Sequence, residues 1–264
     1  MADLLEKIDG GVAVLTMNRP DAMNALSGDM LDRMLEALPR LAADEAVGCI
    51  VLRGAGERAF CAGGDVKGMA AGGRMAGAAF ETKVSDLRRR METSRLLHDM
   101  TKPTIAMVNG VATGAGLSLA LACDVRIAAK SARMTTAFIK VGFSGDFGGH
   151  YFLQRIVGTA RARELYFSSD ILNAEQIERL GLATRIVEDA KLEAETMALA
   201  QKIAAGPRLA FYHMKRNMKV AEDGTLAEAL DSEANWQIRT GETEDHKEAA
   251  KAFVEKRAPV FKGR

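Results

Sequence analysis

The chain has 264 residues, of which 48% are hydrophobic and 27% charged, and its formal net charge is +1. This length suits one large domain, or one domain with a short appendage, and the composition can supply a sizeable core. A charge so close to zero gives no reason to expect nucleic acid or an anionic membrane as a partner. No apolar run approaches the ~20 residues needed to span a bilayer, and the acidic N-terminus lacks the pattern of a signal peptide. We therefore expect a cytoplasmic protein.

The three cysteines, Cys49, Cys61 and Cys123, are odd in number and lack CxxC spacing. This arrangement predicts buried or free thiols in a reducing compartment. We expect neither a disulfide framework nor a metal site.

The first hundred residues alternate between short strands and helices. Asp9-Gly10-Gly11 separates two short apolar runs, which predicts a β-hairpin. Ser27 is a candidate N-cap, because apolar residues follow it at helical spacing. The Gly- and Ala-rich segment 70–77 is expected to be mobile. The expected elements are strands at 4–8, 12–17 and 47–52 and helices from Ser27 to Leu41 and over 81–100.

The centre of the chain is segment 109–124, which reads Asn-Gly-Val-Ala-Thr-Gly-Ala-Gly-Leu-Ser-Leu-Ala-Leu-Ala-Cys-Asp. We expect an apolar strand before it at 104–108 and a buried helix over 117–123. The glycines between them would let the backbone turn sharply and let a ligand approach it closely. The free N–H groups at a helix start carry partial positive charge, so such a turn can hold an anionic oxygen. A tight turn packed against its neighbours is the alternative.

The second half opens with a glycine-rich loop over 138–150 that contains Asp146. Further along, Asn173 and Gln176 have the spacing of a capping box for a short helix. Strands are expected at 125–128 and 183–187.

Beyond Asp189 the pattern is helical, with breaks at Gly206-Pro207 and at Gly224. We therefore predict an α/β core over 1–195 and a helical C-terminal region over 196–264.

Leu192, Leu199 and Ile203 recur at helical spacing near this boundary. We expect their apolar face to be buried at an oligomer interface. Packing of the same face within its own chain is the alternative.

Three local patterns and the order of the elements resemble the crotonase (enoyl-CoA hydratase/isomerase) superfamily. The patterns are Asn-Arg-Pro-Asp-Ala-Met-Asn-Ala-Leu at 18–26, Phe-Cys-Ala-Gly-Gly-Asp at 60–65 and the central segment 109–124. The C-terminal residues 253–257 and 261–262 are also similar. The match spans nearly the whole chain in order, so it is specific for the superfamily. It is much less specific for the reaction, because one scaffold hosts varied chemistry.

The resemblance implies an α/β, crotonase-like spiral of β-β-α units followed by a helical trimerisation region. It also implies an acyl-CoA thioester as substrate, coenzyme A only as part of that substrate, and a homotrimer or dimer of trimers. Two backbone N–H groups hold the thioester oxygen in this family, and position by position they belong to Gly64 and Ala115. Such donors stabilise an enolate as its charge develops, typically by several kcal/mol, and the helix dipole at Ala115 adds to this.

The resemblance also places the adenine and pantetheine of coenzyme A beside two loops, at Ala22, Met23, Ala62, Gly63, Asp65 and Val66. Asp21 departs from the family pattern, in which a basic residue beside the CoA phosphates is common. Lys67 and Lys262 are therefore our candidates for the phosphate contacts. For Lys67 a solvated surface lysine is the alternative.

Two glutamates of the family's hydratases are absent. One belongs two residues after Gly116, where this chain has Ser118, and the other belongs four residues before Gly142, where it has Phe138. Ser118 cannot act as a general base near neutral pH unless another group takes its proton, and a phenylalanine cannot act at all. The two-carboxylate route to water addition therefore lacks both of its groups.

Asp146 follows Gly142 by four residues, in Ser-Gly-Asp-Phe-Gly-Gly. Relatives that isomerise dienoyl-CoA or ring-epoxide CoA thioesters carry a catalytic Asp at this place. The alternative is an Asp that bonds its own backbone in a glycine-rich turn. The resemblance favours catalysis, and Phe138, Phe143 and Phe147 are then the expected apolar walls.

The leading hypothesis is an isomerase that moves a double bond, or rearranges an unsaturated ring, with Asp146 as proton shuttle. The second is a hydratase or dehydratase that combines Asp146 with a differently placed partner. A dehalogenase would also need a catalytic histidine, and His98 does not match that position. A non-catalytic acyl-CoA-binding or scaffold protein is favoured by the missing glutamates and opposed by the retained Gly64 and Ala115.

Overall fold

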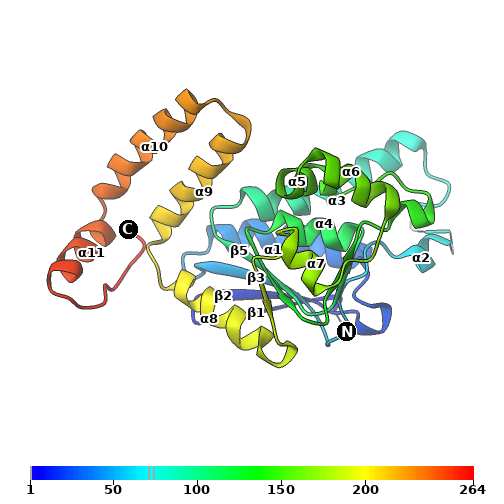
Figure 1. Ribbon diagram of the computed structural model, residues 1–264, viewed down its shortest axis with the longest axis horizontal. Helices are drawn as coiled ribbons and strands as arrows, with labels where there is room; N and C mark the ends of the chain where they lie inside the picture. Colours follow the sequence, from blue (N-terminus) through cyan, green and yellow to red (C-terminus); the bar gives the residue numbers. More distant parts are fainter. Residues whose placement is uncertain (1, 71, 74) are drawn as a thin grey trace.

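The computed structural model describes residues 2–70, 72–73 and 75–264, and its strands form two sheets (Figure 1). The larger sheet has the order β1-β2-β3-β5-β7-β9, in which β1 and β2 are antiparallel and the other neighbours are parallel. The smaller sheet has the order β4-β6-β8 and is parallel. The strands are β1 (Leu4–Asp9), β2 (Val12–Met17), β3 (Cys49–Gly54), β4 (Ala59–Cys61), β5 (Thr104–Val108), β6 (Val111–Thr113), β7 (Val125–Ala129), β8 (Arg133–Thr135) and β9 (Arg185–Val187).

Helices follow the strands and form a separate arm at the C-terminal end. The α-helices are α1 (Gly28–Ala43), α2 (Val66–Ala70), α3 (Phe80–Asp99), α4 (Ala115–Ala122), α5 (Gly149–Val157), α6 (Thr159–Ser168), α7 (Ala174–Arg179), α8 (Leu192–Ala204), α9 (Arg208–Asp223), α10 (Leu226–Gly241) and α11 (Glu244–Val254). The 3-10 helices are η1 (Pro20–Ala22), η2 (Phe138–Val141) and η3 (Asp189–Lys191).

The chain repeats a β-β-α unit. In β3-β4-α2 and β5-β6-α4, the first strand joins the larger sheet, the second strand joins the smaller one, and a helix follows. The unit that begins with β7 and β8 continues the same alternation before α5. Each turn of this spiral therefore brings a strand-to-helix connection to the same end of the molecule, and this arrangement confirms the predicted fold class.

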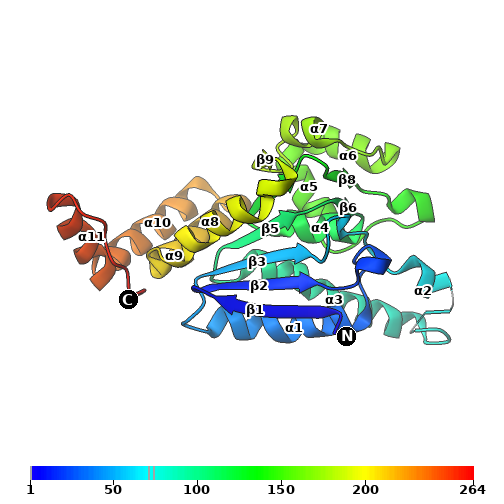
Figure 2. The same cartoon turned by 90° about the horizontal axis from the view of Figure 1, so that it is seen from below.

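Helix α1 shows why the sequence pattern predicted this core. The Ser27 hydroxyl accepts a hydrogen bond from the Met30 amide at 3.1 Å, as expected for an N-cap. Met30, Met34 and Leu38 lie on the buried face of the helix. Burial of one such side chain contributes about 1.5–3 kcal/mol, so this face fixes the helix beneath the sheet (Figure 2).

Helix α8 covers the other face of the larger sheet. Leu192 and Ala200 belong to a core cluster with side chains from β2, β3, β5 and β7, and Leu199 and Ile203 pack against that cluster. The expectation that the Leu192, Leu199 and Ile203 face lies at an oligomer interface is therefore wrong, because the sheet of the same chain buries it. The predicted division near residue 195 falls inside this helix.

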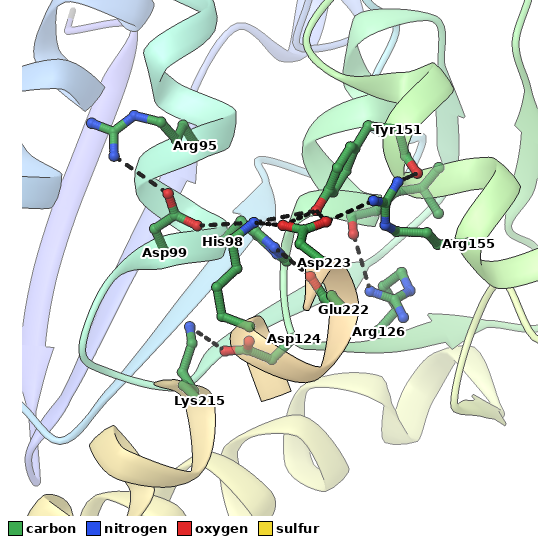
Figure 3. A network of polar contacts seen from close by, with 12 residues as sticks. Arg95, His98, Asp99, Asp124, Arg126, Tyr151, Arg155, Lys215, Glu222 and Asp223 are labelled. Atoms are coloured by element: carbon green, nitrogen blue, oxygen red, sulfur yellow. Dashed lines mark hydrogen bonds and ion pairs between the residues drawn. The ribbon is translucent and has the colours of Figure 1, made fainter. Parts of the chain in front are cut away.

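Helices α9 to α11 form an arm that extends away from the sheets (Figures 1 and 2). Ion pairs join α9 to the core, among them Lys215–Asp124 at 2.8 Å and Arg155–Asp223 at 2.9 Å (Figure 3). Pairs that are partly exposed to water contribute little stability each, about 0–1 kcal/mol. The position of α9 relative to the core thus depends on several polar contacts together.

Most of the expected longer elements are present, but three short strands were missed. The central segment contains β6 between its glycines, where only a turn was expected. Residues 71 and 74 of the segment expected to be mobile lie outside the described residues. The three cysteines are buried free thiols, as predicted. No helix of the described part of the chain has the length and hydropathy to cross a membrane.

Candidate active site

Two glycine-containing turns meet at the end of the smaller sheet. Strands β4 and β6 are parallel neighbours, so the turns that follow them lie side by side. A Cβ atom on Gly116 would lie 2.3 Å from the Cys61 carbonyl oxygen, and one on Gly63 would lie 2.7 Å from the Thr113 carbonyl oxygen. Real Cβ atoms do not approach so closely, so glycine permits the contact between these turns.

The contact positions the two predicted N–H donors. The Ala115 amide is the first of α4 and therefore has no acceptor within that helix. The Gly64 amide donates to no acceptor among the described residues. Gly64 and Ala115 both line one cavity of about 560 Å³. Two unused donors at one cavity can bind an oxygen that carries negative charge.

Asp146 lines the same cavity, together with Phe143 and Phe147. Its Oδ1 is buried and accepts no hydrogen bond from any residue that the structure describes. Burial raises the pKa of the Asp146 carboxyl from 3.8 to about 6. The expected apolar walls are thus present in part: Phe147 is buried, Phe143 is half exposed, and Phe138 is buried but does not line the cavity.

The loop that carries Asp146 depends on residues with positive φ. Gly145 and Gly148 have φ of +113° and +74°, and Phe147, between Asp146 and Gly148, has φ of +51°. Glycine adopts these values at low cost, whereas phenylalanine does so rarely. The loop thereby turns Asp146 toward the cavity and leads directly into α5.

The Ser118 side chain forms a hydrogen bond with the backbone of this loop. Its buried hydroxyl can donate to the Asp146 carbonyl at 3.1 Å or to the Gly114 carbonyl at 3.2 Å. The Asp146 carbonyl also accepts a hydrogen bond from the Gly149 amide at 3.2 Å. The residue at the first missing glutamate position therefore supports the backbone of Asp146.

Phe138, at the second missing glutamate position, belongs to an aromatic stack. Its ring lies parallel to that of Tyr166 with centroids 6.2 Å apart, and the His150 ring also stacks on Tyr166, with centroids 4.1 Å apart. Burial and the nearby Asp146 charge raise the pKa of Tyr166. His150 is exposed and does not line the cavity, so the stack supports the site from outside it.

The loops predicted to bind coenzyme A lie beside this cavity. The Ala62 amide donates to the Met23 carbonyl at 3.0 Å, and the Leu26 amide donates to the Gly63 carbonyl at 2.8 Å. These bonds bring Ala22, Met23, Ala62 and Gly63 together. The arrangement can accept an elongated ligand beside Gly64, although it does not identify that ligand.

The charged residues predicted to contact coenzyme A do not line this cavity. Hydrogen bonds from the Gly68 amide and from Arg19, both at 3.0 Å, lower the pKa of Asp65, so its carboxylate is occupied within the chain. Val66 and Lys67 are exposed on the short helix α2. Lys262 lines a separate cavity at the arm and is not brought together with Gly64.

Two cationic residues of α3, Lys83 and Arg90, line the cavity without having been singled out from the sequence. Arg90 is buried and donates to Asp86 at 2.9 Å and to the Gly28 carbonyl at 3.3 Å. In the sequence, the i,i+4 spacing of Asp86 and Arg90 is the one indication that these residues form a pair. Such pairs are common on solvated helix faces, so the spacing did not indicate a place at the cavity. Among the described residues, no cluster of three His, Cys, Asp or Glu side chains could hold a metal ion.

Comparison with known proteins shows the family of the chain. The enoyl-CoA hydratase/isomerase family matches residues 7–264. A 1,2-epoxyphenylacetyl-CoA isomerase from Escherichia coli is 36% identical over the whole of both chains. A short-chain-enoyl-CoA hydratase from Clostridium acetobutylicum is also 36% identical, over 96% of this chain and 95% of its own.

Solved structures of the same family share the fold. An enoyl-CoA hydratase from Bacillus anthracis superposes with a TM-score of 0.92 at 30% identity, covering 99% of this chain and 100% of its own. An enoyl-CoA hydratase from Mycobacterium smegmatis gives a TM-score of 0.90 at 34% identity, covering 98% of each chain. With the family match over nearly the full length, these similarities show that the chain is an enzyme of the enoyl-CoA hydratase/isomerase (crotonase) family.

Proposed function

We propose that this enzyme isomerises an unsaturated acyl-CoA, either by moving a double bond or by rearranging an unsaturated ring. The substrate thioester oxygen binds the Gly64 and Ala115 amides, and Asp146 transfers the proton. Coenzyme A enters only as part of the substrate, and its adenine and pantetheine lie along the loops of Met23 and Ala62. Lys67 is the remaining candidate within this site for a CoA phosphate contact.

The double-bond shift has two balanced steps. The Asp146 carboxylate removes a proton from a carbon activated by the thioester, and the electron pair moves onto the thioester oxygen as an enolate. The two N–H donors stabilise that charge as it develops. Asp146 then returns the proton to a different carbon, so the double bond moves and the product has the mass of the substrate.

One observation carries this proposal: Asp146 presents a buried, unpartnered Oδ1 at the cavity that Gly64 and Ala115 also line. A base acts best when its pKa lies near the working pH, and burial raises the pKa of Asp146 to about 6. Ser118 and Phe138 occupy the two positions that hydratases fill with glutamates. Ser118 supports the Asp146 loop, and Phe138 belongs to the aromatic stack.

A hydratase is the second candidate, because the relative named a short-chain-enoyl-CoA hydratase is as similar to this chain as the named isomerase. Water addition needs one group to activate the water and another to protonate carbon. Within the cavity Asp146 would fill one role. The buried Arg90 cannot act as a base because a guanidinium stays protonated, so the second role would fall to Asp86 or Lys83, which also line the cavity.

The test is incubation with enoyl-, dienoyl- and ring-derived CoA thioesters, followed by mass spectrometry and NMR. We expect a product of unchanged mass with a moved double bond or a rearranged ring. A product heavier by one water would establish the hydratase instead. Tight binding of the thioesters without any conversion would favour a non-catalytic binding protein.

A further inference from the structure

Helix α3 presents a stripe of polar side chains to the cavity that contains Asp146. The stripe consists of Lys83, Asp86 and Arg90, which all line the cavity. They follow one another at the i,i+3 and i,i+4 spacings of an α-helix, so they lie on one face of it. The proposed isomerisation uses none of these side chains.

Much of the remaining lining is apolar. Leu26, Leu31, Met75, Leu87 and Phe147 contribute to it. A pocket of this kind accepts an apolar ligand body, and its few polar groups fix the orientation and the specificity of the ligand. The stripe on α3 is therefore expected to contact a polar part of the ligand.

Arg90 is buried, and its guanidinium still has unused hydrogen-bonding capacity. Its Nε donates to Asp86 at 2.9 Å, whereas Nη1 reaches the Gly28 carbonyl at 3.3 Å and Nη2 reaches Asp32 at 3.4 Å. The last two distances are long for N–H···O bonds, which centre on about 2.9–3.0 Å. Because a guanidinium has five N–H groups, Arg90 retains donors that have no partner among the described residues.

The stripe offers hydrogen-bond donors without an excess of charge. Lys83 and Arg90 are the cations among the described lining residues, and Asp86 and Asp146 are the carboxylates. Lys83 forms no ion pair with a described carboxylate, whereas Asp86 pairs with both Arg89 and Arg90. An uncharged oxygen therefore suits the stripe better than an anion, which Asp86 would repel.

The acyl group is the part of the substrate that meets this stripe. In the proposed function the Gly64 and Ala115 amides hold the thioester, and coenzyme A lies along the loops of Met23 and Ala62. Neither Met23 nor Ala62 lines the cavity, so the acyl group fills it and points toward α3. This placement rests on the proposed function.

We propose that Arg90 and Lys83 select an acyl group that carries an uncharged oxygen beyond the thioester, as a hydroxyl or a ketone. The oxygen accepts hydrogen bonds from the unused N–H groups of these two side chains. A hydrogen bond to a charged donor is worth about tenfold to a hundredfold in affinity. An alkyl group would instead cover the N–H groups without giving them an acceptor. Arg90 and Lys83 thus determine specificity and take no part in the proton transfer.

The test measures by calorimetry the binding of saturated acyl-CoA thioesters, which have no double bond to move. Series of matched chain length end in a methyl, a hydroxyl, a methyl ketone or a carboxylate group. We expect the hydroxyl or the ketone compound to bind about tenfold or more tighter than the methyl compound at the length that reaches α3. The tighter of the two identifies the class of acyl group. Because none of these compounds reacts, the result does not depend on whether the enzyme is an isomerase.

Arg90→Met should abolish the preference for oxygen, and Lys83→Met should reduce it. Arg88→Met is the matched control and should keep the preference, since Arg88 is exposed on α3, pairs with Glu92 and does not line the cavity. Lys83 is also exposed, so its variant tests the stripe even if Arg90→Met disturbs folding.

Three results would overturn the proposal. In the parent protein, these are methyl compounds that bind as tightly as the oxygen-bearing ones at every length, or carboxylates that bind most tightly. In the variants, it is a preference for oxygen that is the same in the folded Lys83→Met or Arg90→Met protein as in Arg88→Met.

Discussion

The carboxyl group of Asp146 differs from an ordinary surface carboxyl in two respects. Its Oδ1 is buried without a hydrogen-bond donor among the described residues, and its pKa is raised to about 6 because the charged form is desolvated. A base with this pKa is largely ionised at neutral pH and can still hold a proton during a turnover. Both properties come from the burial of Asp146 at the cavity, where the adjacent Phe147 is one of the walls.

The raised pKa predicts how stability depends on pH. Between the ordinary value of 3.8 and the folded value of about 6, the folded state binds more protons than the unfolded state. The free energy of unfolding therefore falls as pH rises through this window, and the loss is complete above it. Asp146→Asn removes the titration, so it should be more stable than the parent by about 3 kcal/mol near pH 8 and nearly equal near pH 4. Urea unfolding across this range checks the trend, and a constant difference would contradict it.

A second prediction concerns the backbone N–H group of Ala115 and the reaction rate. Proline fits the first position of a helix but has no N–H, so Ala115→Pro removes one oxyanion donor. Loss of one such donor costs about 10²–10³ in rate. Ala174→Pro, at the first position of α7 and away from the cavity, is the matched control and should keep its activity. Rates within a few-fold of the parent for folded Ala115→Pro would show that the thioester does not bind there.

The elements around the site pack together at Gly149, where α4, α5, α6 and the Asp146 loop meet. The position of each therefore depends on the others. A Cβ atom at Gly149 would lie 2.5 Å from both the Ser118 Oγ and the Tyr166 hydroxyl oxygen. The two hydroxyls are thus close to each other beneath the start of α5. A larger residue at Gly149 has to move the helix or the Asp146 loop.

Gly149→Ala should therefore destabilise the protein by about 1–3 kcal/mol, the usual cost of overpacking, and should lower kcat more than it raises KM. Gly241→Ala is the control, because nothing lies within 4 Å of its added Cβ in α10. Thermal unfolding and steady-state kinetics of both variants give the answer. Equal kcat in the two would mean that the position of Asp146 does not depend on this packing.

The elements also show what the sequence could and could not predict. Longer elements such as α1 were predictable because a capping residue is followed by apolar residues that recur at helical spacing. Strand β6 was not, because three residues show no period and its partners β4 and β8 are distant in the chain. The resemblance to the crotonase superfamily singled out Gly64, Ala115 and Asp146, and all three line one cavity. The support by Ser118 and the burial of Arg90 depend on tertiary packing, which one sequence does not reveal.

At the scale of the whole molecule, the arm and the sheet have different surfaces. Helix α8 buries its apolar face on the sheet, whereas α9 and α10 leave Met214, Met218, Leu230 and Ile238 exposed. Apolar side chains gathered on one projecting element are typical of an association surface. We therefore propose that the arm contributes to a homotrimer or a dimer of trimers.

Light scattering on the purified 28.4 kDa chain should give a mass of three or six chains. Ile238→Asp, on an exposed position of α10, should shift the population toward smaller species, because it places a charge in an apolar contact. Ile8→Asp, on an exposed position of β1, should not. A parent protein with the mass of one chain, or the same shift in both variants, would contradict the proposal.

In the proposed reaction of the whole enzyme, Asp146 moves a proton while Gly64 and Ala115 hold the enolate. The most direct test follows deuterium from solvent into an unsaturated acyl-CoA that the parent isomerises, with parent and Asp146→Asn compared by mass spectrometry and NMR. Asn keeps the shape of the side chain and leaves both N–H donors in place, so the variant should still bind the thioester. We predict that exchange and isomerisation fall together by about 10²–10⁴, the worth of a positioned acid–base group. A folded Asp146→Asn protein that exchanges and isomerises at the parent rate would contradict the account.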